Sequence, residues 1–226
     1  EFKSQVVCLR TGYIGRIIAL TLFPRARAEL RNSATDVPPQ AEMCREDAMN
    51  SKVKLVLIYE GNDEEAIGPA LARWASVVIA QRAEFDCCLL DTSQQRAALG
   101  QLARADAFLI LASEQNHGYS AELKAFIDQA TIRWLARPVA FIGYGGESGG
   151  MNAIAQLRQV LAGQHAVPIC SVVTLPNPWA LLDEKGFFRL SDQARIPMAR
   201  MLVLLNWWAI ALRSAREQKS YELVSQ

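Results

Sequence analysis

The chain has 226 residues, of which 51% are hydrophobic and 21% are charged, and its formal net charge is +1. This length suits one sizeable domain with an appendage, and the composition is ordinary for a globular protein. The near-neutral net charge does not point to the strongly basic surface that is typical of nucleic-acid-binding and membrane-surface proteins. We therefore expect neither a nucleic acid nor a membrane as a partner.

Residues 1–52 form an N-terminal extension by composition. They lack sustained hydrophobic periodicity, and residues 32–40 read as a loop or linker rich in polar residues and proline. Residues 17–22 fit a short helix or a short strand equally well. The chain starts at Glu1, and Met49 lies just before the first strong strand. The extension is interpreted either as a vector-derived or upstream-encoded leader, or as an arm that packs on the domain or on a partner.

From residue 53 the hydrophobic pattern becomes regular. Short, nearly continuous apolar runs indicate strands whose two faces are both covered, as in parallel sheets. The predicted strands are Val53–Tyr59, Phe85–Leu90, Ala107–Ala112, Pro138–Tyr144 and Pro168–Leu175. The predicted helices are Ala66–Gln81, Ser93–Arg104, Ser120–Leu135, Gly149–Gly163 and Pro197–Gln218, the last with Pro197 in its first turn.

Five alternations of strand and helix predict an α/β domain over residues 53–217, with residues 218–226 as a tail. The expected architecture is a doubly wound, five-stranded parallel sheet with helices on both faces and strand order 2-1-3-4-5. In such a sheet the ligand binds beyond the carboxyl ends of the strands, near the switch point. The loops that should carry the site are therefore residues 60–66, 113–119 and 145–150.

The five cysteines, an odd number, show no metal-ligand spacing. They are Cys8, Cys44, Cys87, Cys88 and Cys170. The adjacent Cys87 and Cys88 are interpreted as buried, small apolar residues of a strand rather than as a redox pair. Without a recognisable signal peptide, we expect a reduced, cytoplasmic protein. The apolar stretch Met201–Leu212 is shorter than the about 18 residues that a membrane span needs.

The loops after the third and fourth strands contain the most specific motifs. The first reads SEQNHGYS over residues 113–120 and continues AELKAFID, and the second reads GYGGESGG over residues 143–150. Together they resemble the NADPH-dependent FMN reductase family, which includes many quinone and azo-dye reductases. The matching residues are Glu114, Asn116, Tyr119, Leu123, Lys124, Ile127, Asp128, Tyr144, Gly145, Gly146, Ser148, Gly149 and Gly150, and Trp207-Trp208-Ala209 resembles the closing helix of the family. The resemblance spans residues 53–217.

This resemblance implies a flavodoxin-like fold and an FMN site. Glycines allow backbone N–H groups to approach the acceptor edge of a flat isoalloxazine ring. By resemblance, the glycine loop borders this edge, while Glu114, Gln115 and Asn116 line the ring and the ribityl chain. The implied cofactor-binding residues are Gly61, Asn62, Ala66, Ile67, Ser113, Glu114, Gln115, Asn116, Gly118, Tyr144, Gly145, Gly146, Ser148 and Gly149. The alternative is a pair of tight strand-to-helix turns that need glycine only for their geometry.

The loop after the first strand departs from the family pattern. Relatives show a stretch like G-S-T-R-x-x-R, in which hydroxyls and arginines hold the FMN phosphate. Here Glu60–Ala66 has no hydroxyl, and Asp63 and Ala66 occupy the expected arginine positions. Losing two charge-assisted hydrogen bonds and gaining repulsion should weaken binding by ~4–6 kcal/mol. Alternatively, the four acids form a solvated turn that complements the dipole of the next helix.

The loop after the third strand also departs from the family pattern, because Gln115 replaces an aromatic residue and Ser113 and Ser120 replace prolines.

The favoured function is that of an FMN-dependent NAD(P)H oxidoreductase acting on quinone-like, azo or flavin acceptors. Hydride would pass through the flavin in a ping-pong reaction, so no catalytic side chain and no metal is assigned. The main alternative is a flavodoxin-like binding or regulatory protein that has lost FMN because of the acidic residues 60–65. A third is an enzyme whose ligand lacks the phosphate or differs in charge. The residues leave the acceptor, and NADH versus NADPH, open.

Two further expectations concern surfaces. His117, in the third-strand loop, either faces the cofactor or lies on the surface. The closing helix is more apolar than one sheet face needs, which predicts a homodimer or homotetramer with the third and fourth crossover helices contributing and the cofactor clefts near the interface. The apolar residues on which this rests are Met198, Met201, Leu202, Leu205, Trp208 and Leu212.

Overall fold

A computed structural model describes residues 51–226 except 62–66, 95–99, 185, 189–191 and 224–226. By internal contacts the chain divides into residues 1–47 and residues 48–226, and the fold below is that of the second unit. The expectations for residues 1–50, including the element at 17–22 and the cysteines Cys8 and Cys44, concern residues outside this description.

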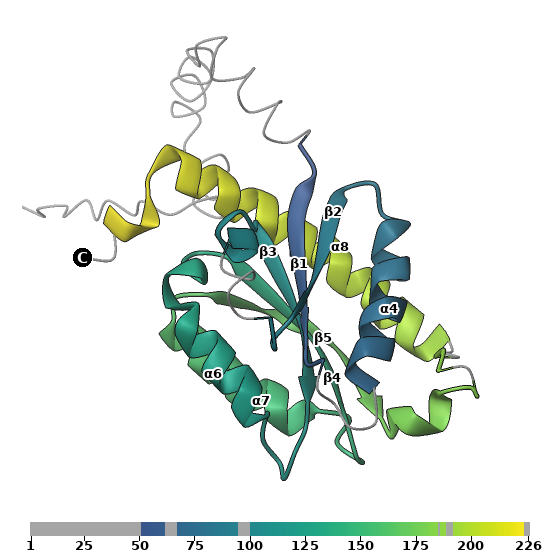
Figure 1. The fold of residues 1–226 in the computed structure, drawn as a ribbon. Coiled ribbons are helices and arrows are strands. Elements are labelled where there is room, and N and C mark those ends of the chain that lie inside the picture. Colours follow the sequence, from purple (N-terminus) through teal and green to yellow (C-terminus); the bar gives the residue numbers. More distant parts are fainter. Residues whose placement is uncertain (1–50, 62–66, 95–99, 185, 189–191, 224–226) are drawn as a thin grey trace, which may run out of the picture. The chain divides into compact units, whose positions relative to one another are not determined.

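Five parallel strands form one sheet in the order β2-β1-β3-β4-β5 (Figure 1). The strands are β1 (Val53–Tyr59), β2 (Phe85–Asp91), β3 (Ala107–Ser113), β4 (Pro138–Gly145) and β5 (Val167–Pro176). Nearly every side chain of β3 and every side chain of β4 is buried, because these central strands are covered on both faces. The predicted parallel sheet and its strand order are confirmed.

Helices cover both faces of the sheet. Helices α4 (Ile67–Ala80) and α8 (Asp192–Gln218) lie on one face, and α6 (Ala121–Gln129) and α7 (Met151–Gly163) lie on the other (Figure 1). Successive strand side chains point to opposite faces. Leu57 of β1 therefore packs with α4 and α8, whereas Ile58 packs in the other core. The described residues also include the short 3-10 helices η1 (Thr131–Arg133), η2 (Pro178–Leu181) and η3 (Tyr221–Leu223).

Helix α6 and the predicted helix 93–104 differ from the prediction. Helix α6 ends at Gln129, six residues before the predicted end, and a 3-10 turn follows so that Trp134 enters the core. The Trp134 ring is fully buried, 4.7 Å from the Phe108 ring, and its Nε1 donates to the Ile127 carbonyl at 3.0 Å. Within predicted helix 93–104, residues 100–103 are helical, residues 93 and 94 are not, and 95–99 fall outside the description.

Helix α8 begins at Asp192, so the prediction that Pro197 lies in the first turn is wrong. Proline is tolerated there at the loss of one helical hydrogen bond near the helix start. Among the residues described, α8 is also long and apolar enough to span a membrane by length and composition, although the stretch Met201–Leu212 alone is too short. Its inner side chains, such as Leu202 and Leu205, are nevertheless fully buried against the sheet, as in a core helix of an α/β domain.

The edge strand β2 exposes one of the two adjacent cysteines. Cys87 is partly buried and Cys88 is exposed, so the expectation that both are buried is wrong for Cys88. The physical reason is that β2 pairs only with β1. Burial, followed by the charge of Asp86, raises the pKa of the Cys88 thiol, and burial with the adjacent Cys88 raises the pKa of Cys87 to about 12. Neither thiol is therefore primed as a nucleophile at neutral pH.

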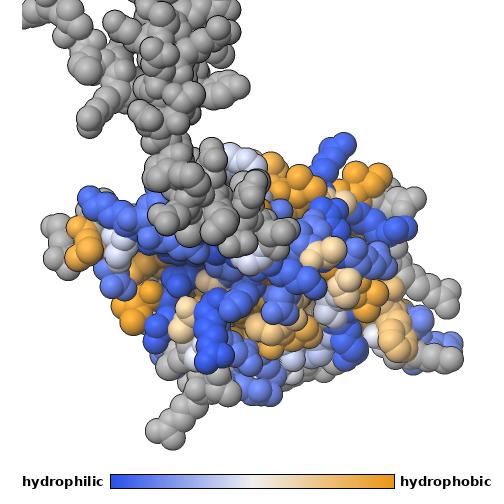
Figure 2. Space-filling model, turned by 90° about the horizontal axis from the view of Figure 1, so that it is seen from above, coloured by the Kyte–Doolittle hydropathy of each residue, from blue (hydrophilic) through white to orange (hydrophobic). Residues whose placement is uncertain are grey.

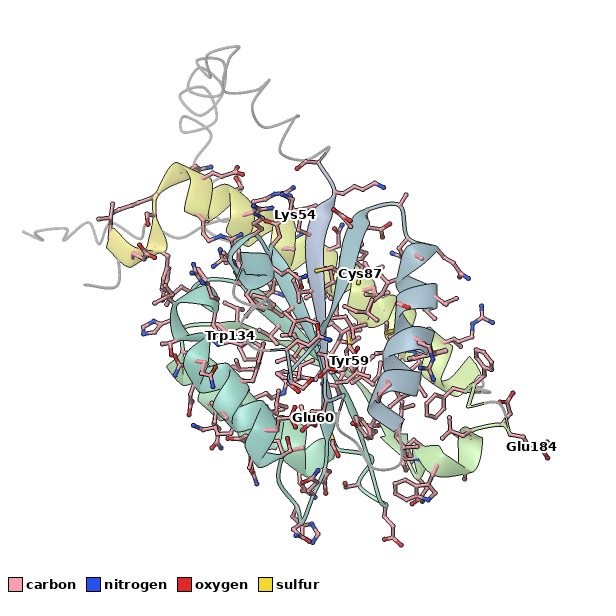
Figure 3. All side chains as sticks on the ribbon, in the orientation of Figure 1. Lys54, Tyr59, Glu60, Cys87, Trp134 and Glu184 are labelled. Atoms are coloured by element: carbon pink, nitrogen blue, oxygen red, sulfur yellow. The ribbon has the colours of Figure 1, made fainter. Side chains whose placement is uncertain are left out.

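An arginine cluster lies at the amino ends of the strands, where Figure 3 labels Lys54. The buried Asp106 accepts hydrogen bonds from Arg213 at 3.1 Å and from the backbone N–H of Lys54 at 3.0 Å, and Arg216 lies 3.5 Å away. Arg213 also donates to the carbonyl of Ser51 at 3.1 Å. We call Asp106, Arg213 and Arg216 the amino-end clamp, because they join α8 to the starts of β1 and β3.

The clamp holds more positive than negative charge. Burial lowers the pKa of Arg216 to about 10, with a further decrease from neighbouring Arg137 that Asp106 opposes. Arg216 and Arg137 also donate to backbone carbonyls: Arg216 to that of Ala136 at 2.6 Å and Arg137 to that of Ala105 at 2.7 Å.

Seen from above, hydrophilic residues cover much of the described surface, and hydrophobic residues form separate patches (Figure 2).

Candidate functional site

The candidate site lies at the carboxyl ends of β1, β3 and β4, the end of the sheet at which Figure 3 labels Glu60. The parallel register brings the loops after β3 and β4 side by side. The backbone N–H of Glu114 donates to the Tyr144 carbonyl at 2.8 Å, and that of Asn177, after β5, donates to the Gly145 carbonyl at 2.8 Å. Residues 113–118 and 144–149, which were predicted to act together, are thus adjacent in space.

The side chain of Glu114 joins these two loops. Ser148 Oγ donates to Glu114 Oε2 at 2.6 Å, the Asn152 backbone N–H donates to the same oxygen at 3.0 Å, and Asn152 Nδ2 donates to Oε1 at 2.8 Å. The Glu114 side chain is only 8% exposed. Burial acts to raise the pKa of Glu114, but the hydrogen bonds from Ser148 and Asn152 outweigh it and leave that pKa below its usual value. Glu114 is therefore an anion that holds the loops together.

This contact limits what Glu114 and Ser148 offer to a ligand. Both were predicted to bind the cofactor, and their side-chain oxygens are directed to each other. These side-chain atoms already have partners within the chain, and their predicted role as cofactor ligands stays a prediction. Sequence reasoning did not single out Asn152. Its signal is its place in the first turn of α7, directly after the glycine run.

The loop after β3 closes in a tight turn. The N–H of Gln115 donates to the Gly118 carbonyl at 2.8 Å, and the N–H of Gly118 donates back at 3.0 Å. Asn116 and His117, at the centre of the turn, have φ angles of 47° and 63°, a left-handed conformation that asparagine adopts more readily than most residues. Gln156 Nε2 donates to the His117 carbonyl at 2.9 Å and fixes the turn to α7.

His117 lies at the solvent end of this network. Its side chain is 89% exposed, and its Nδ1 lies 3.9 Å from Glu114 Oε1. Of the two alternatives for this histidine, the structure therefore supports the surface position.

The glycines of the loop after β4 serve different purposes. A Cβ on Gly145 would lie 2.9 Å from the Glu114 Cβ, and a Cβ on Gly150 would lie 2.3 Å from the Tyr144 nitrogen. Gly149 and Gly150 also have left-handed φ angles of 60° and 89°. Gly146 is exposed, and a Cβ there would meet nothing within 4 Å. Geometry thus explains three of the four glycines, and only Gly146 leaves its backbone open to an approaching flat ligand.

The loop after β1 begins with a buried carboxylate rather than a solvated one. Glu60 is 6% exposed, and its Oε1 accepts a hydrogen bond from Ser120 Oγ. Ser120 also caps α6 by accepting from the Leu123 N–H at 3.0 Å. The interpretation of Glu60 as part of a solvated acidic turn is therefore wrong. A proline at position 120 could not donate this hydrogen bond. Two departures from the family pattern, the acidic residue Glu60 and the serine in place of proline at position 120, therefore depend on each other.

Gly61 is tied to the neighbouring strand. Its N–H donates to Asp91 Oδ1 at 3.1 Å, and a Cβ at Gly61 would lie 1.9 Å from Asp91 Oδ2. The Ser93 N–H donates to the same carboxylate at 2.9 Å. Sequence reasoning missed Asp91, although its position directly across the register from Tyr59, at the end of β2, places it at the site. One backbone donor of the first loop is thus already bound by the chain's own carboxylate.

The remaining predicted residues of this region are accounted for as follows. Ile67 and Tyr144 are buried in the core, at 2% and 3% exposure. The Tyr144 hydroxyl reaches the start of α4, where a Cβ on Gly68 would lie 3.1 Å from it. Ser113 ends β3 and is partly buried. Asn62, Asp63 and Ala66 lie outside the described residues.

The donor set at this end of the sheet suits a planar ring with acceptor atoms along one edge. It offers backbone groups at Gly146 and a rigid turn at Asn116, while the carboxylates Glu60, Asp91 and Glu114 are held by hydrogen bonds of the chain itself. In the part of the chain that the structure describes, no group of three or more His, Cys, Asp or Glu residues could hold a metal ion. The part of the site formed by the Gly146 backbone and the turn at Asn116 therefore fits the ring of FMN.

Comparisons with known proteins agree with this geometry. The model of a family described as NADPH-dependent FMN reductase matches residues 53–180. An NAD(P)H-dependent FMN reductase of Schizosaccharomyces pombe is 34% identical over 90 residues, which are 38% of this chain and 44% of that protein. The chain thus matches less than half the length of this relative.

Solved structures show the same fold at low sequence identity. FerB, a flavoenzyme NAD(P)H:(acceptor) oxidoreductase from Paracoccus denitrificans, superposes with a TM-score of 0.56 at 17% identity, over 70% of this chain and 97% of FerB. The apo form of the NADH:FMN oxidoreductase EmoB gives 0.53 at 14% identity, over 69% and 90% of the two chains. The fold is flavodoxin-like, as predicted.

Proposed function

The chain belongs to the NADPH-dependent FMN reductase family, and from this premise we propose that it is an FMN-dependent NAD(P)H oxidoreductase. Its electron donor is NADPH or NADH, and its acceptors are quinone-like, azo or flavin compounds. The observation that carries the proposal is the open backbone of Gly146 between loops that Glu114 and Ser148 hold together. When bound, FMN supplies the redox chemistry, and the protein binds and orients it.

The residues of this chain act by positioning. The anionic Glu114 fixes the loop after β4 against the loop after β3, so the Gly146 backbone needs no rearrangement when a ring approaches. The Gln115–Gly118 turn, fixed to α7 by Gln156, supports the neighbouring wall of the site. No described side chain has to exchange a proton for this function.

Phosphate binding should be the weak part of the site. The Gly61 N–H is bound by Asp91, and no cationic side chain occurs in residues 60–66. Asn62 and the backbone N–H groups after it are the donors that remain by sequence. We expect micromolar rather than nanomolar affinity for FMN, because charge-assisted bonds worth about 1.5–3 kcal/mol each are missing.

The test is a fluorescence titration of FMN and of riboflavin, which lacks the phosphate, into the flavin-free protein and into the double variant Asp63→Arg/Ala66→Arg. We expect micromolar FMN binding that tightens by about 2–4 kcal/mol in the variant. Riboflavin affinity should be the same in both proteins. Oxidation of NADPH and NADH with a quinone acceptor then tests the reaction and identifies the donor.

Two outcomes would redirect the proposal. Nanomolar FMN binding by the unaltered protein would contradict the charge argument while supporting the function. If neither protein binds FMN or riboflavin, the second candidate holds, a flavodoxin-like binding or regulatory protein that has lost FMN. The observation that favours this second candidate is the Gly61–Asp91 contact, which occupies a donor at the phosphate end with the chain's own carboxylate.

A further inference from the structure

A cavity of about 440 Å³ opens beside strands β1 and β2, away from the candidate FMN site. Val56 of β1 and Ala105 line it, and both are buried in the core that α6 and α7 cover. Lys54 lines it as well, and Figure 3 labels Lys54 and Glu60 at opposite ends of the sheet. The volume lies within the range of about 300–1,000 Å³ that is typical of small-molecule sites. The cavity is therefore large enough for a small organic ligand and is separate from the flavin site.

Polar side chains from three segments of the chain surround the cavity. Lys54 of β1 and Asp86 of β2 are register partners in the parallel sheet, so their side chains project from the same face. Cys88, two positions after Asp86, projects from that face too. Gln101 and Arg104 line the cavity from the segment that precedes β3. All five residues are exposed, so each side chain is accessible to a dissolved ligand.

The charged groups of the cavity are not committed to partners in the chain. Among the residues that the structure describes, the Lys54 ammonium, the Arg104 guanidinium and the Asp86 carboxylate form no hydrogen bond and no ion pair. By contrast, Arg82, just before β2, pairs with Glu84 at 2.6 Å. Uncommitted polar groups that converge on a hollow with an apolar floor are typical of a ligand site.

We propose that this cavity binds a small organic monoanion, a carboxylate or a sulfonate with an apolar body, at a site separate from that of FMN. The acidic group of the ligand lies between Lys54 and Arg104, and its apolar body covers Val56. The Gln101 amide offers a further donor. Asp86 faces the same space, and its charge opposes a second negative charge on the ligand. A monoanion is therefore preferred to a dianion such as phosphate.

Cys88 reports whether the cavity is occupied. Its thiol is exposed and lines the cavity, whereas Cys170, which is also exposed, does not line it. Because burial and the charge of Asp86 raise the pKa of the Cys88 thiol, Cys88 should react slowly enough for its alkylation to be followed at mildly alkaline pH. A ligand in the cavity should shield Cys88 and leave Cys170 unaffected.

The test is alkylation of the full chain by N-ethylmaleimide, followed at each cysteine by mass spectrometry. The probe is anilinonaphthalene sulfonate, an aromatic monoanion, and the matched neutral compound is phenylnaphthylamine, which has the same rings without the sulfonate. We expect the sulfonate to slow the alkylation of Cys88 several-fold without any change at Cys170. The neutral compound and inorganic phosphate should have little effect at the same concentrations.

Substitutions of exposed side chains then separate the charges. Lys54→Gln and Arg104→Gln together should abolish the protection of Cys88. The control Lys219→Gln, which removes an exposed cation outside the cavity, should leave the protection intact. Asp86→Asn should lower the sulfonate concentration that gives half of the full protection several-fold, because it removes the opposing charge. Each variant is compared with and without the probe, and all should keep the melting temperature of the unaltered chain.

Four results would overturn the proposal. They are alkylation of Cys88 that stays unchanged at the highest probe concentration, equal slowing at Cys88 and Cys170, protection that survives the double substitution of Lys54 and Arg104, and equal protection by the neutral compound. Since Glu114 and Gly146 of the candidate FMN site do not line the cavity, none of these outcomes depends on whether the chain binds a flavin.

Discussion

The two ends of the sheet differ in the sign of their partly buried charged side chains. At the amino end, Arg213 and Arg216 surround the single carboxylate of Asp106 and donate to backbone carbonyls. At the carboxyl end, Glu60 and Glu114 accept hydrogen bonds from the hydroxyl groups of Ser120 and Ser148. Cations thus predominate at one end and anions at the other. At the carboxyl end, a Cβ on the exposed Gly146 would also meet nothing within 4 Å, so this backbone is open to a ligand.

Helix direction explains this polarity. Helices α6 and α7 start at the carboxyl end, where the positive ends of their dipoles favour carboxylates such as Glu114, whose partner Asn152 lies in the first turn of α7. Helix α8 ends at the amino end with Arg216 in its last turn, which complements a negative dipole end. The comparison suggests that the amino end stabilises the domain and the carboxyl end serves the ligand. Three predictions test this division.

The largest effect is expected from Asp106→Ala at the amino-end clamp. Removing this carboxylate takes the acceptor shared by the partly buried Arg213 and Arg216 away, and removing one partner of a buried ion pair costs about 3–5 kcal/mol. Urea unfolding should show this loss, while the FMN affinity of the folded protein stays unchanged. Asp128→Ala, which removes the exposed ion pair with Lys124, should leave the unfolding free energy as it is. A loss of FMN affinity without a loss of stability in Asp106→Ala would contradict the division.

A pair of glycine substitutions separates geometry from ligand binding at the carboxyl end. Gly150→Ala places a Cβ 2.3 Å from the Tyr144 nitrogen at a left-handed φ, so it should lower the unfolding free energy by about 1–3 kcal/mol. Gly146→Ala meets open space and should leave stability unchanged. It should nevertheless weaken FMN binding, because a methyl group keeps a flat ring away from the backbone. If Gly146→Ala binds FMN as tightly as the unaltered chain, the ring does not lie against this residue.

Local sequence patterns predicted the sheet closely and the site only in part. The limits of β1 were predicted as observed, and the other strands differ by at most one residue at either end, because strands covered on both faces are apolar without interruption. The Glu60–Ser120 and Gly61–Asp91 contacts join residues 60 and 30 positions apart. No local pattern encodes such pairs, since they depend on strand register and on where each helix starts. Asn152 was missed for the same reason, because its role depends on its hydrogen bonds to Glu114, 38 positions away in the sequence.

The smallest effect is expected from Glu114→Gln, and it should depend on pH. Glu114 has a pKa below its usual value in the folded protein, because the hydrogen bonds from Ser148 and Asn152 to the anion outweigh the effect of burial. A carboxyl group of this kind adds stability above its unfolded pKa, about 4.3, and loses it as the pH falls through its folded pKa. At pH 7 the variant should therefore be about 1–2 kcal/mol less stable than the unaltered chain, since charge-assisted hydrogen bonds become neutral ones. The difference should shrink as the pH falls below about 4. Urea unfolding at several pH values measures it, with Glu147→Gln, an exposed carboxylate of the same loop, as the control. A difference that stays constant from pH 7 to pH 3 would mean that Glu114 supports the loops by its shape and not by its charge.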